Sequence, residues 1–177
     1  MKKLILLLFV ACVTLSANAQ FYVGGSTSLW FGKDDTSISI LPEVGYVMND
    51  RWAFGTEIGF IHQNQTIMDF NGLYYDRKMN GVVVGPYARF TYFKKGMVGL
   101  FVDGGLDYRL TKVKNADAEH GVRLGLKPGV ALSLTDRLSM VAKFGFLGFD
   151  HDYATAGNGG GFNFSGNNLS LGFYVSF

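Results

Sequence analysis

The sequence predicts an all-β chain: an eight-stranded antiparallel up-and-down transmembrane β-barrel. Three observations carry this prediction: a leader for export, alternation of apolar with small or polar residues along the chain, and connections that are short at one end and long at the other. The alternation is clearest at the end of the chain, where every second residue is apolar and so lies on one face of a strand: Leu169, Leu171, Phe173, Val175 and Phe177. No sustained apolar period of 3.6 residues follows the leader, so we expect no helices there.

Residues 1–19 are predicted to be a secretory signal peptide that is removed. Two lysines precede an apolar run over residues 4–15, and small residues at 17–19 suit cleavage before Gln20. The run is shorter than the roughly 20 apolar residues that a membrane-spanning helix needs. A lipoprotein leader centred on Cys12 is the alternative. Residues 20–177 then form a single barrel domain.

Loss of the leader changes what chemistry the chain can perform. It removes Cys12, the only cysteine, so we expect neither disulfides nor thiolate chemistry. It also removes Lys2 and Lys3, so 14 of the 16 basic residues remain against 14 acidic residues. A net charge near zero gives no electrostatic basis for binding nucleic acid. We expect no cofactor and no metal.

Eight strands are expected, each with its own alternation. They run over residues 21–31, 36–47, 51–62, 81–93, 97–112, 121–134, 138–149 and 168–177. In the second strand Ile38, Ile40 and Val44 oppose Ser39, Glu43 and Gly45. In the fifth, Val102, Leu106 and Leu110 oppose Asp103, Asp107 and Arg109, and in the sixth Val122, Leu124 and Leu126 oppose Arg123, Gly125 and Lys127.

The connections alternate in length. Residues 48–50, 94–96 and 135–137 are predicted to be tight turns, whereas residues 63–80, 113–120 and 150–167 are predicted to be long loops, and the short loop 32–35 is the exception. Bacterial outer-membrane barrels show this asymmetry, with short periplasmic turns and longer outer loops. An even number of strands returns both ends of the chain to the periplasm.

One face of the predicted strands is bulky and apolar, and the other is mostly Gly, Ser and Ala with isolated charges. The interior of an eight-stranded barrel is just wide enough for side chains to fill, so the second face suits the inside and the apolar face is expected to contact lipid. Outward aromatic residues near the turns would form an interfacial girdle: Phe21, Tyr46, Trp52, Tyr92 and Phe177. Proline removes a ladder hydrogen bond, so we expect bulges or slipped pairing at Pro42, Pro86 and Pro128.

Six charged residues of the inner face lie at similar distances from the turns and are predicted to share one layer: Glu43, Glu57, Arg89, Asp103, Lys127 and Lys143. Lys127 and Lys143 should meet the two glutamates across the lumen, while Arg89 and Asp103 pair on one flank. Cross-lumen pairing offsets much of the cost of burying charge. Asp107, Arg109 and Arg123 are predicted to form a second layer nearer the outside. The layers are read either as a static plug or as a gate for ions or protons.

Other polar groups carry weaker hypotheses. His62, His120 and His151 lie near loop ends, where a lipid-modifying enzyme would place its base, but no nucleophile motif accompanies them. Residues 150–152, Asp-His-Asp, cannot readily converge on one metal ion. The long loops 63–80 and 150–167 are rich in Asn, Gly, Tyr and Phe and are candidates for contact with an extracellular ligand.

The whole chain after the leader resembles the small eight-stranded outer-membrane barrels, namely the OmpA-like transmembrane domain and its OmpX-like, porin-like relatives. Residues 169–177 carry this resemblance with their terminal aromatic, together with the strand-turn-strand units at 42–52 and 134–138. It implies that Tyr174 and Phe177 belong to a signal read by the outer-membrane assembly machinery, and that lipid and lipopolysaccharide surround the barrel. Because the chain ends with the last strand, we expect no periplasmic cell-wall-binding domain.

The sequence therefore predicts an integral protein of the outer membrane of a Gram-negative bacterium with no catalytic residues. We expect a structural role in envelope integrity and a charged interior plug. A small diffusion or ion channel is the alternative, and an enzyme acting on lipid is the second alternative.

Overall fold

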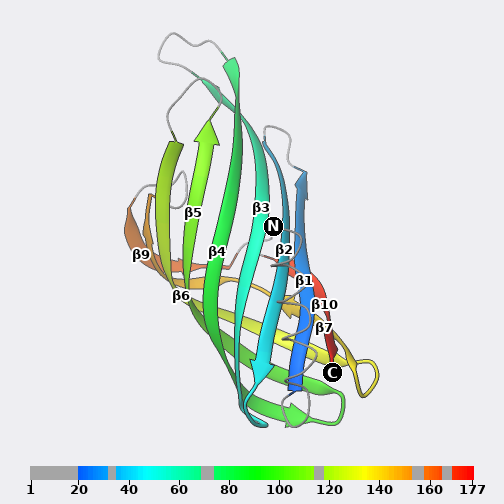
Figure 1. Cartoon of the computed structure of the whole chain (residues 1–177). Coiled ribbons are helices and arrows are strands. Elements are labelled where there is room, and N and C mark those ends of the chain that lie inside the picture. The colour runs from blue at the N-terminus through cyan, green and yellow to red at the C-terminus, as the bar shows by residue number, and fades with distance from the viewer. Residues whose placement is uncertain (1–19, 32–34, 69–73, 114–117, 153–157, 165–168) are drawn as a thin grey trace, which may run out of the picture.

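Ten strands form one antiparallel sheet in the part of the chain that the computed structural model describes, residues 20–31, 35–68, 74–113, 118–152, 158–164 and 169–177 (Figure 1). The strands are β1 (Gln20–Phe31), β2 (Asp35–Val47), β3 (Trp52–Met68), β4 (Tyr74–Lys95), β5 (Val98–Val113), β6 (Ala118–Ser133), β7 (Leu138–Lys143), β8 (Phe146–His151), β9 (Gly159–Asn163) and β10 (Ser170–Ser176). The predicted leader, residues 1–19, lies outside the described residues. Over the described ranges, no helix is long and apolar enough to cross a membrane.

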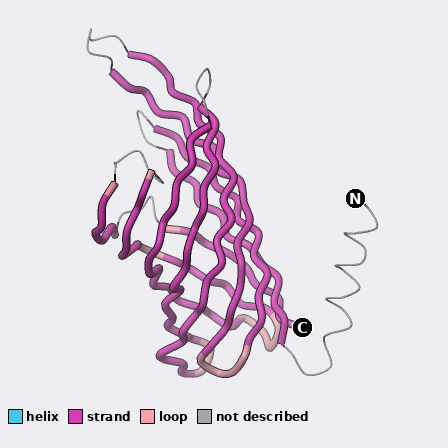
Figure 2. Tube along the Cα trace, turned by 60° about the vertical axis from the view of Figure 1, so that its left-hand side comes forward, coloured by secondary structure: helices cyan, strands magenta, loops and turns pink. Residues whose placement is uncertain are grey.

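The sheet closes on itself as an eight-stranded barrel, which confirms the predicted fold class. Each strand from β1 to β6 pairs antiparallel with the next, and β1 also pairs with β10. The seventh barrel strand consists of β7 and β8, which both pair with β6. The eighth consists of β9 and β10, which pair with β8 and β7 respectively. The strands wrap around one interior (Figure 2).

The two faces of the wall differ as the alternation predicts. On β4, Val82 and Val84 are 49% and 41% exposed, whereas Val83 between them is 1% exposed. The outward face is apolar on many strands: Ile40, Val44, Ile58, Phe60, Leu106, Leu124 and Leu171 are all exposed. Near the turns the outward side chains are aromatic, and the rings of Trp52 and Phe90 pack with centroids 4.8 Å apart. Such a surface suits hydrocarbon, with an interfacial girdle at the turn end.

Predictions for the three long outer loops are wrong in length because the flanking strands continue into them. β3 and β4 remain paired as far as Met68 and Tyr74, so most of residues 63–80 forms a hairpin that reaches beyond its neighbours (Figure 1). Strands β5 and β6 likewise extend into residues 113–120. Strand β9 lies inside residues 150–167 and pairs with β8. Outside the membrane, backbone hydrogen bonds between strands do not require apolar side chains. The strands therefore continue beyond the point where the apolar alternation ends.

The in-strand prolines disturb the ladder less than predicted. Between β2 and β3, the paired residues on the two sides of Pro42 follow one register, and the same is true of the pairs around Pro86 between β4 and β5. A proline lacks one N–H donor, so it removes one rung without moving the strand. The predicted slip is therefore wrong at Pro42 and Pro86.

A bulge does occur opposite Pro128. Strand β6 pairs with β8 at Leu126 and with β7 from Gly129 onward, and between these pairs the seventh barrel strand holds one residue more than β6. The Phe144 N–H donates a hydrogen bond to the Pro128 carbonyl at 3.0 Å. Gly145, the next residue, has a φ of +75°. An extra residue on one strand is what defines a β-bulge.

The bulge reverses which side chains of the seventh barrel strand point inward. Lys143 is buried before it, and Phe146 is buried after it. Side chains two residues apart share a face, so Phe146 and Asp150 face the interior, where strict alternation from Lys143 would send them to lipid. The bulge thereby brings Asp150 opposite Arg123 on β6.

Replacement of Gly145 by alanine should lower the free energy of unfolding by about 1–3 kcal/mol, because positive φ is costly for a residue with a Cβ atom. That Cβ would also lie 2.4 Å from a ring carbon of Phe164. In the control Gly159→Ala, nothing lies within 4 Å of the new Cβ, and we expect little change. Urea unfolding of the refolded barrel in lipid vesicles measures both variants. Equal losses in the two would show that the bulge conformation does not depend on glycine.

Candidate functional site: the charged interior

Strand alternation sets the predicted interior carboxylates inside the barrel. Glu43 on β2 and Glu57 on β3 lie directly opposite each other in the ladder, and they are 1% and 4% exposed. Like charges directly opposite each other on neighbouring strands destabilise a sheet. The pair therefore requires cations, and these come from strands on the other side of the lumen.

Lys143 on β7 provides the most buried of these cations. Its Nζ lies 2.8 Å from Glu43 Oε1, 3.6 Å from Glu57 Oε2 and 3.5 Å from Asp103 Oδ2. The Lys143 side chain is 6% exposed and that of Glu43 is fully buried. A buried ion pair is tolerated only when geometry and further hydrogen bonds offset the loss of hydration. One ammonium among three carboxylates satisfies that condition.

A second cation lies beside the first. Lys127 Nζ lies 3.0 Å from Glu57 Oε1 and 2.6 Å from Asp107 Oδ2, and its side chain is 23% exposed. Arg89 completes the set, because its Nε and Nη2 donate to the two carboxylate oxygens of Asp103 at 2.7 and 2.8 Å. We call these seven residues the interior charge network: Glu43, Glu57, Arg89, Asp103, Asp107, Lys127 and Lys143.

The structure thus brings together all six residues predicted for the first layer, but it arranges the predicted second layer differently. Asp107 joins the interior charge network through Lys127. Arg109 Nη2 donates to Gln63 Oε1 at 2.8 Å. Arg123 forms a two-pronged pair with Asp150, with both nitrogen–oxygen distances 2.7 Å. The sequence analysis placed Asp150 in the loop 150–167, and alternation alone does not show that the bulge turns this side chain inward.

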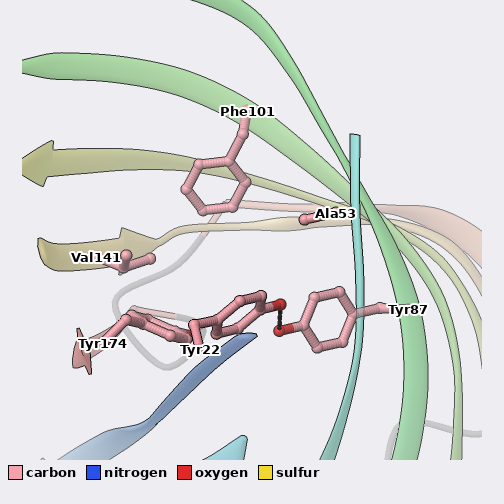
Figure 3. Packing of buried hydrophobic residues seen from close by; sticks show 6 residues of the cluster. All are labelled: Tyr22, Ala53, Tyr87, Phe101, Val141 and Tyr174. Atoms are coloured by element: carbon pink, nitrogen blue, oxygen red, sulfur yellow. Dashed lines mark hydrogen bonds between the residues drawn. The ribbon is translucent and has the colours of Figure 1, made fainter. Parts of the chain in front are cut away.

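Four further inward side chains line the interior, and the sequence analysis assigned none of them to it: Tyr22, Tyr87, Tyr174 and Ser26. Tyr87 Oη donates to Glu43 Oε2 at 2.7 Å, and Ser26 Oγ donates to Glu43 Oε1 at 3.3 Å. The hydroxyls of Tyr22 and Tyr87 lie 2.6 Å apart, a contact drawn in Figure 3. The buried carboxylate of Glu43 therefore accepts hydrogen bonds from Lys143, Tyr87 and Ser26. Each of the four residues is an even number of positions from other inward residues of its own strand, and this spacing was the signal that could have placed it inside.

Inward glycines make room for these rings. A Cβ atom on Gly45 would lie 2.2 Å from Tyr22 Cζ, and one on Gly55 would lie 2.7 Å from the hydroxyl oxygens of both Tyr22 and Tyr87. Only a residue without a side chain permits such a close approach. The small inward residues thus leave the space that the large ones occupy.

Aromatic rings pack around the Arg89 guanidinium at one end of the network. The Arg89 guanidinium carbon lies 4.0 Å from the centroid of the Phe101 ring and 5.3 Å from that of Tyr174. Phe101 is 1% exposed. Cation–π contact adds to the ion pair with Asp103 in holding the guanidinium in place.

The two residues of the predicted assembly signal differ in position. Tyr174 is 4% exposed, and its ring meets that of Tyr22 edge-on at 5.6 Å (Figure 3). Phe177 is 67% exposed, and its N–H donates to the Phe21 carbonyl at 2.9 Å. Their recognition by assembly machinery stays a prediction.

Cavities in the lumen are unequal in size. At the turn end a cavity of about 380 Å³ reaches inward as far as Tyr22 and Arg89. Among the charges, the space bounded by Glu57, Asp103, Lys127 and other network residues is about 10 Å³. One water needs roughly 10–15 Å³, so this space holds one water at most.

The histidines lie apart from the network. His62 Nδ1 is 2.7 Å from Asn80 Oδ1, and His120 Nδ1 is 2.5 Å from Tyr108 Oη, both at exposed sites. His151 is exposed and lies beside Asp152. Among the residues that the structure describes, no group of three or more His, Cys, Asp or Glu side chains is arranged to hold a metal ion.

Comparison with known proteins agrees with this architecture. A family model described as outer membrane protein beta-barrel domain matches residues 4–177. The crystal structure of Neisserial surface protein A, NspA, superposes with a TM-score of 0.54 at 15% identity and covers 90% of this chain and 96% of that chain, a likeness of fold alone. The Yersinia pestis outer membrane protein Ail in a phospholipid bilayer nanodisc has a TM-score of 0.46 at 14% identity, covering 90% and 98%. No curated protein sequence matches.

Breaking the central ion pair should destabilise the barrel strongly. Glu43→Gln leaves Lys143 buried beside one partner fewer, and removal of one member of a buried pair costs about 3–5 kcal/mol. The double variant Glu43→Gln/Lys143→Met should lose less than the sum of the single losses, because coupled residues are not additive. Urea unfolding in lipid vesicles measures the cycle.

The control for this cycle is Asp136→Asn, which removes one acidic charge from an exposed residue between β6 and β7. We expect a change within about 0.5 kcal/mol for such a surface position. Strict additivity in the double variant would mean that Glu43 and Lys143 do not interact.

Proposed function

Because this chain belongs to the family of outer membrane protein β-barrel domains and lies in the outer membrane of a Gram-negative bacterium, we propose that it is a closed, non-conducting barrel with a structural role in the envelope. Its interior charge network would act as a plug that fills the lumen. The wall and the plug are then one unit, because each cation of the network is held by residues of other strands.

The observation that carries this proposal is the small space among the charges. A conducting pore needs a continuous column of water, whereas the pocket among Glu57, Asp103, Lys127 and Lys143 has room for one water at most. The carboxylates of Glu43, Asp103 and Asp107 are each 3% exposed or less. Opening a path would require Lys143 to leave several partners at once.

A small diffusion or ion channel is the second candidate, favoured by one specific observation. The cavity at the turn end is large enough for many waters, and Lys127 keeps 23% of its side chain exposed. The cavity reaches Arg89, which pairs with Asp103 of the interior charge network. Rearrangement of a few side chains there would turn the plug into a gate.

Binding of an extracellular ligand is proposed at the outer hairpins alone. The β3–β4 hairpin extends past both neighbouring strands, and β9 exposes Phe162 to 76%. A paired hairpin presents side chains in a fixed register, which favours binding over a loop of the same length because less conformational entropy is lost. Binding there would be independent of the plug.

Single-channel recording of refolded residues 20–177 in a planar bilayer tests the plug. We expect no ohmic steps from the native chain. The variant Glu43→Gln/Glu57→Gln should leak, because it leaves the ammonium groups of Lys127 and Lys143 short of counter-charge and they will draw in water. The control Arg123→Gln/Asp150→Asn neutralises an ion pair outside the network and should stay silent.

Steady conductance steps from the native chain would instead establish the channel. Silence from both the native chain and the Glu43/Glu57 variant would show that the charges do not close the lumen. Either result overturns the proposed plug.

A further inference from the structure

The lipid-facing surface has a notch at one place in the wall. Four outward residues stand directly opposite one another along a row across β3 to β6: Phe54, Ala88, Gly104 and Leu126. The two in the middle are the smallest, while those at the ends are large. The row therefore dips at Ala88 and Gly104.

The dip is a groove of about 470 Å³. The side chains of Pro86, Leu106 and Leu124 extend it outward along the strands from the row, with Phe54 and Leu126 at its sides. A Cβ atom added to Gly104 would meet its first neighbour, Leu126 Cδ2, at 3.4 Å, which is ordinary van der Waals contact. An alanine would therefore fit at the centre of this notch, where the chain has a glycine.

Strand β4 gives the depth of the notch. Along its outward face the order from the turn is Tyr92 and Phe90, then Ala88 and Pro86, then Val84 and Val82, and finally Asn80 and Lys78. The aromatic pair marks the interface at the turn end, and Asn80 begins the polar outer surface. The notch thus lies in the apolar band, just above the periplasmic aromatic girdle.

We propose that this notch binds one acyl chain of a lipid from the periplasmic leaflet. No charged side chain lines it, so it offers nothing to a phosphate or a sugar. At this depth the part of a lipid that reaches the protein is hydrocarbon, since headgroups lie level with the aromatic girdle. An unfilled groove would lose dispersion contacts with its lining, and a flexible acyl chain restores them.

This proposal rests on the location of the barrel in the membrane and is independent of the plug. A second copy of the chain is the competing occupant, because Phe54 stands beside the notch and could enter the notch of a partner related by a twofold axis. Lipid is favoured because it already surrounds the barrel and requires no complementary protein surface. The test distinguishes the two.

The experiment compares two alanine-to-leucine variants that add the same group to the lipid face. Ala88→Leu fills the notch, whereas Ala142→Leu adds its side chain on β7, opposite Val130 and Leu171 and away from the notch. The refolded chain is placed in vesicles of phosphatidylethanolamine and phosphatidylglycerol with a small share of phospholipid carrying a photoactivatable diazirine midway along one acyl chain. Mass spectrometry locates the crosslinked residues.

We expect residues 104–106 and 124–126 of the native chain to be labelled several-fold more than the outward residues of β10. Ala88→Leu should bring that labelling down to the level of β10, and Ala142→Leu should leave it unchanged. Slower migration after heating on a gel checks that each variant is folded. Gly104→Ala, which fills the notch partly, replaces Ala88→Leu if the latter does not fold.

Even labelling around the barrel would overturn the proposal, as would an equal loss in both leucine variants. Disulfide-linked dimers of a Phe54→Cys variant under mild oxidation, together with absence of lipid label in the notch, would assign it to a second copy. The chain after the leader has no native cysteine, so such a link would be specific.

Discussion

The absence of water from the hydrocarbon core of a membrane is the constraint on which the rest of this structure depends. An open sheet edge there would leave backbone N–H and C=O groups without partners, so the sheet must close. Closure with eight strands gives a lumen only as wide as the side chains that fill it. Every charge on the inner face then needs a partner within that lumen, and the residues around it must be small.

The interior charge network meets this requirement by joining strands that are distant around the barrel. Lys143 on β7 contacts carboxylates from β2, β3 and β5. Neighbouring strands are held by the ladder, whereas these ion pairs connect opposite walls. Glycines opposite the tyrosines complete the packing, since Gly45 and Gly55 leave the space that Tyr22 occupies. On the outer face, the small residues Ala88 and Gly104 leave the notch in which we propose that a lipid acyl chain binds.

Much of this could be predicted because a strand alternates with a period of two. Parity alone sends Glu43, Lys127 and Arg89 inward, and counting residues from the turns brings them to one depth. Pro128 predicted a disturbance of the ladder, and a bulge lies opposite it, but alternation does not encode the positive φ of Gly145 or the change of face that follows on β8. The residues of β8 change face, and the partner of Arg123, Asp150, was missed for that reason. The outer strand ends were missed because lipid no longer selects apolar residues there.

Solid-state NMR of the refolded chain in lipid vesicles tests the central claim most directly, through dipolar coupling between lysine ¹⁵Nζ and glutamate ¹³Cδ nuclei. The account predicts a strong coupling between Lys143 and Glu43, whose Nζ and Oε1 atoms lie 2.8 Å apart. It also predicts that the Lys143 ammonium protons exchange slowly with water, since the side chain is 6% exposed. Ammonium protons that all exchange as in free lysine, with no coupling to a carboxylate, would contradict a lumen closed by paired charges.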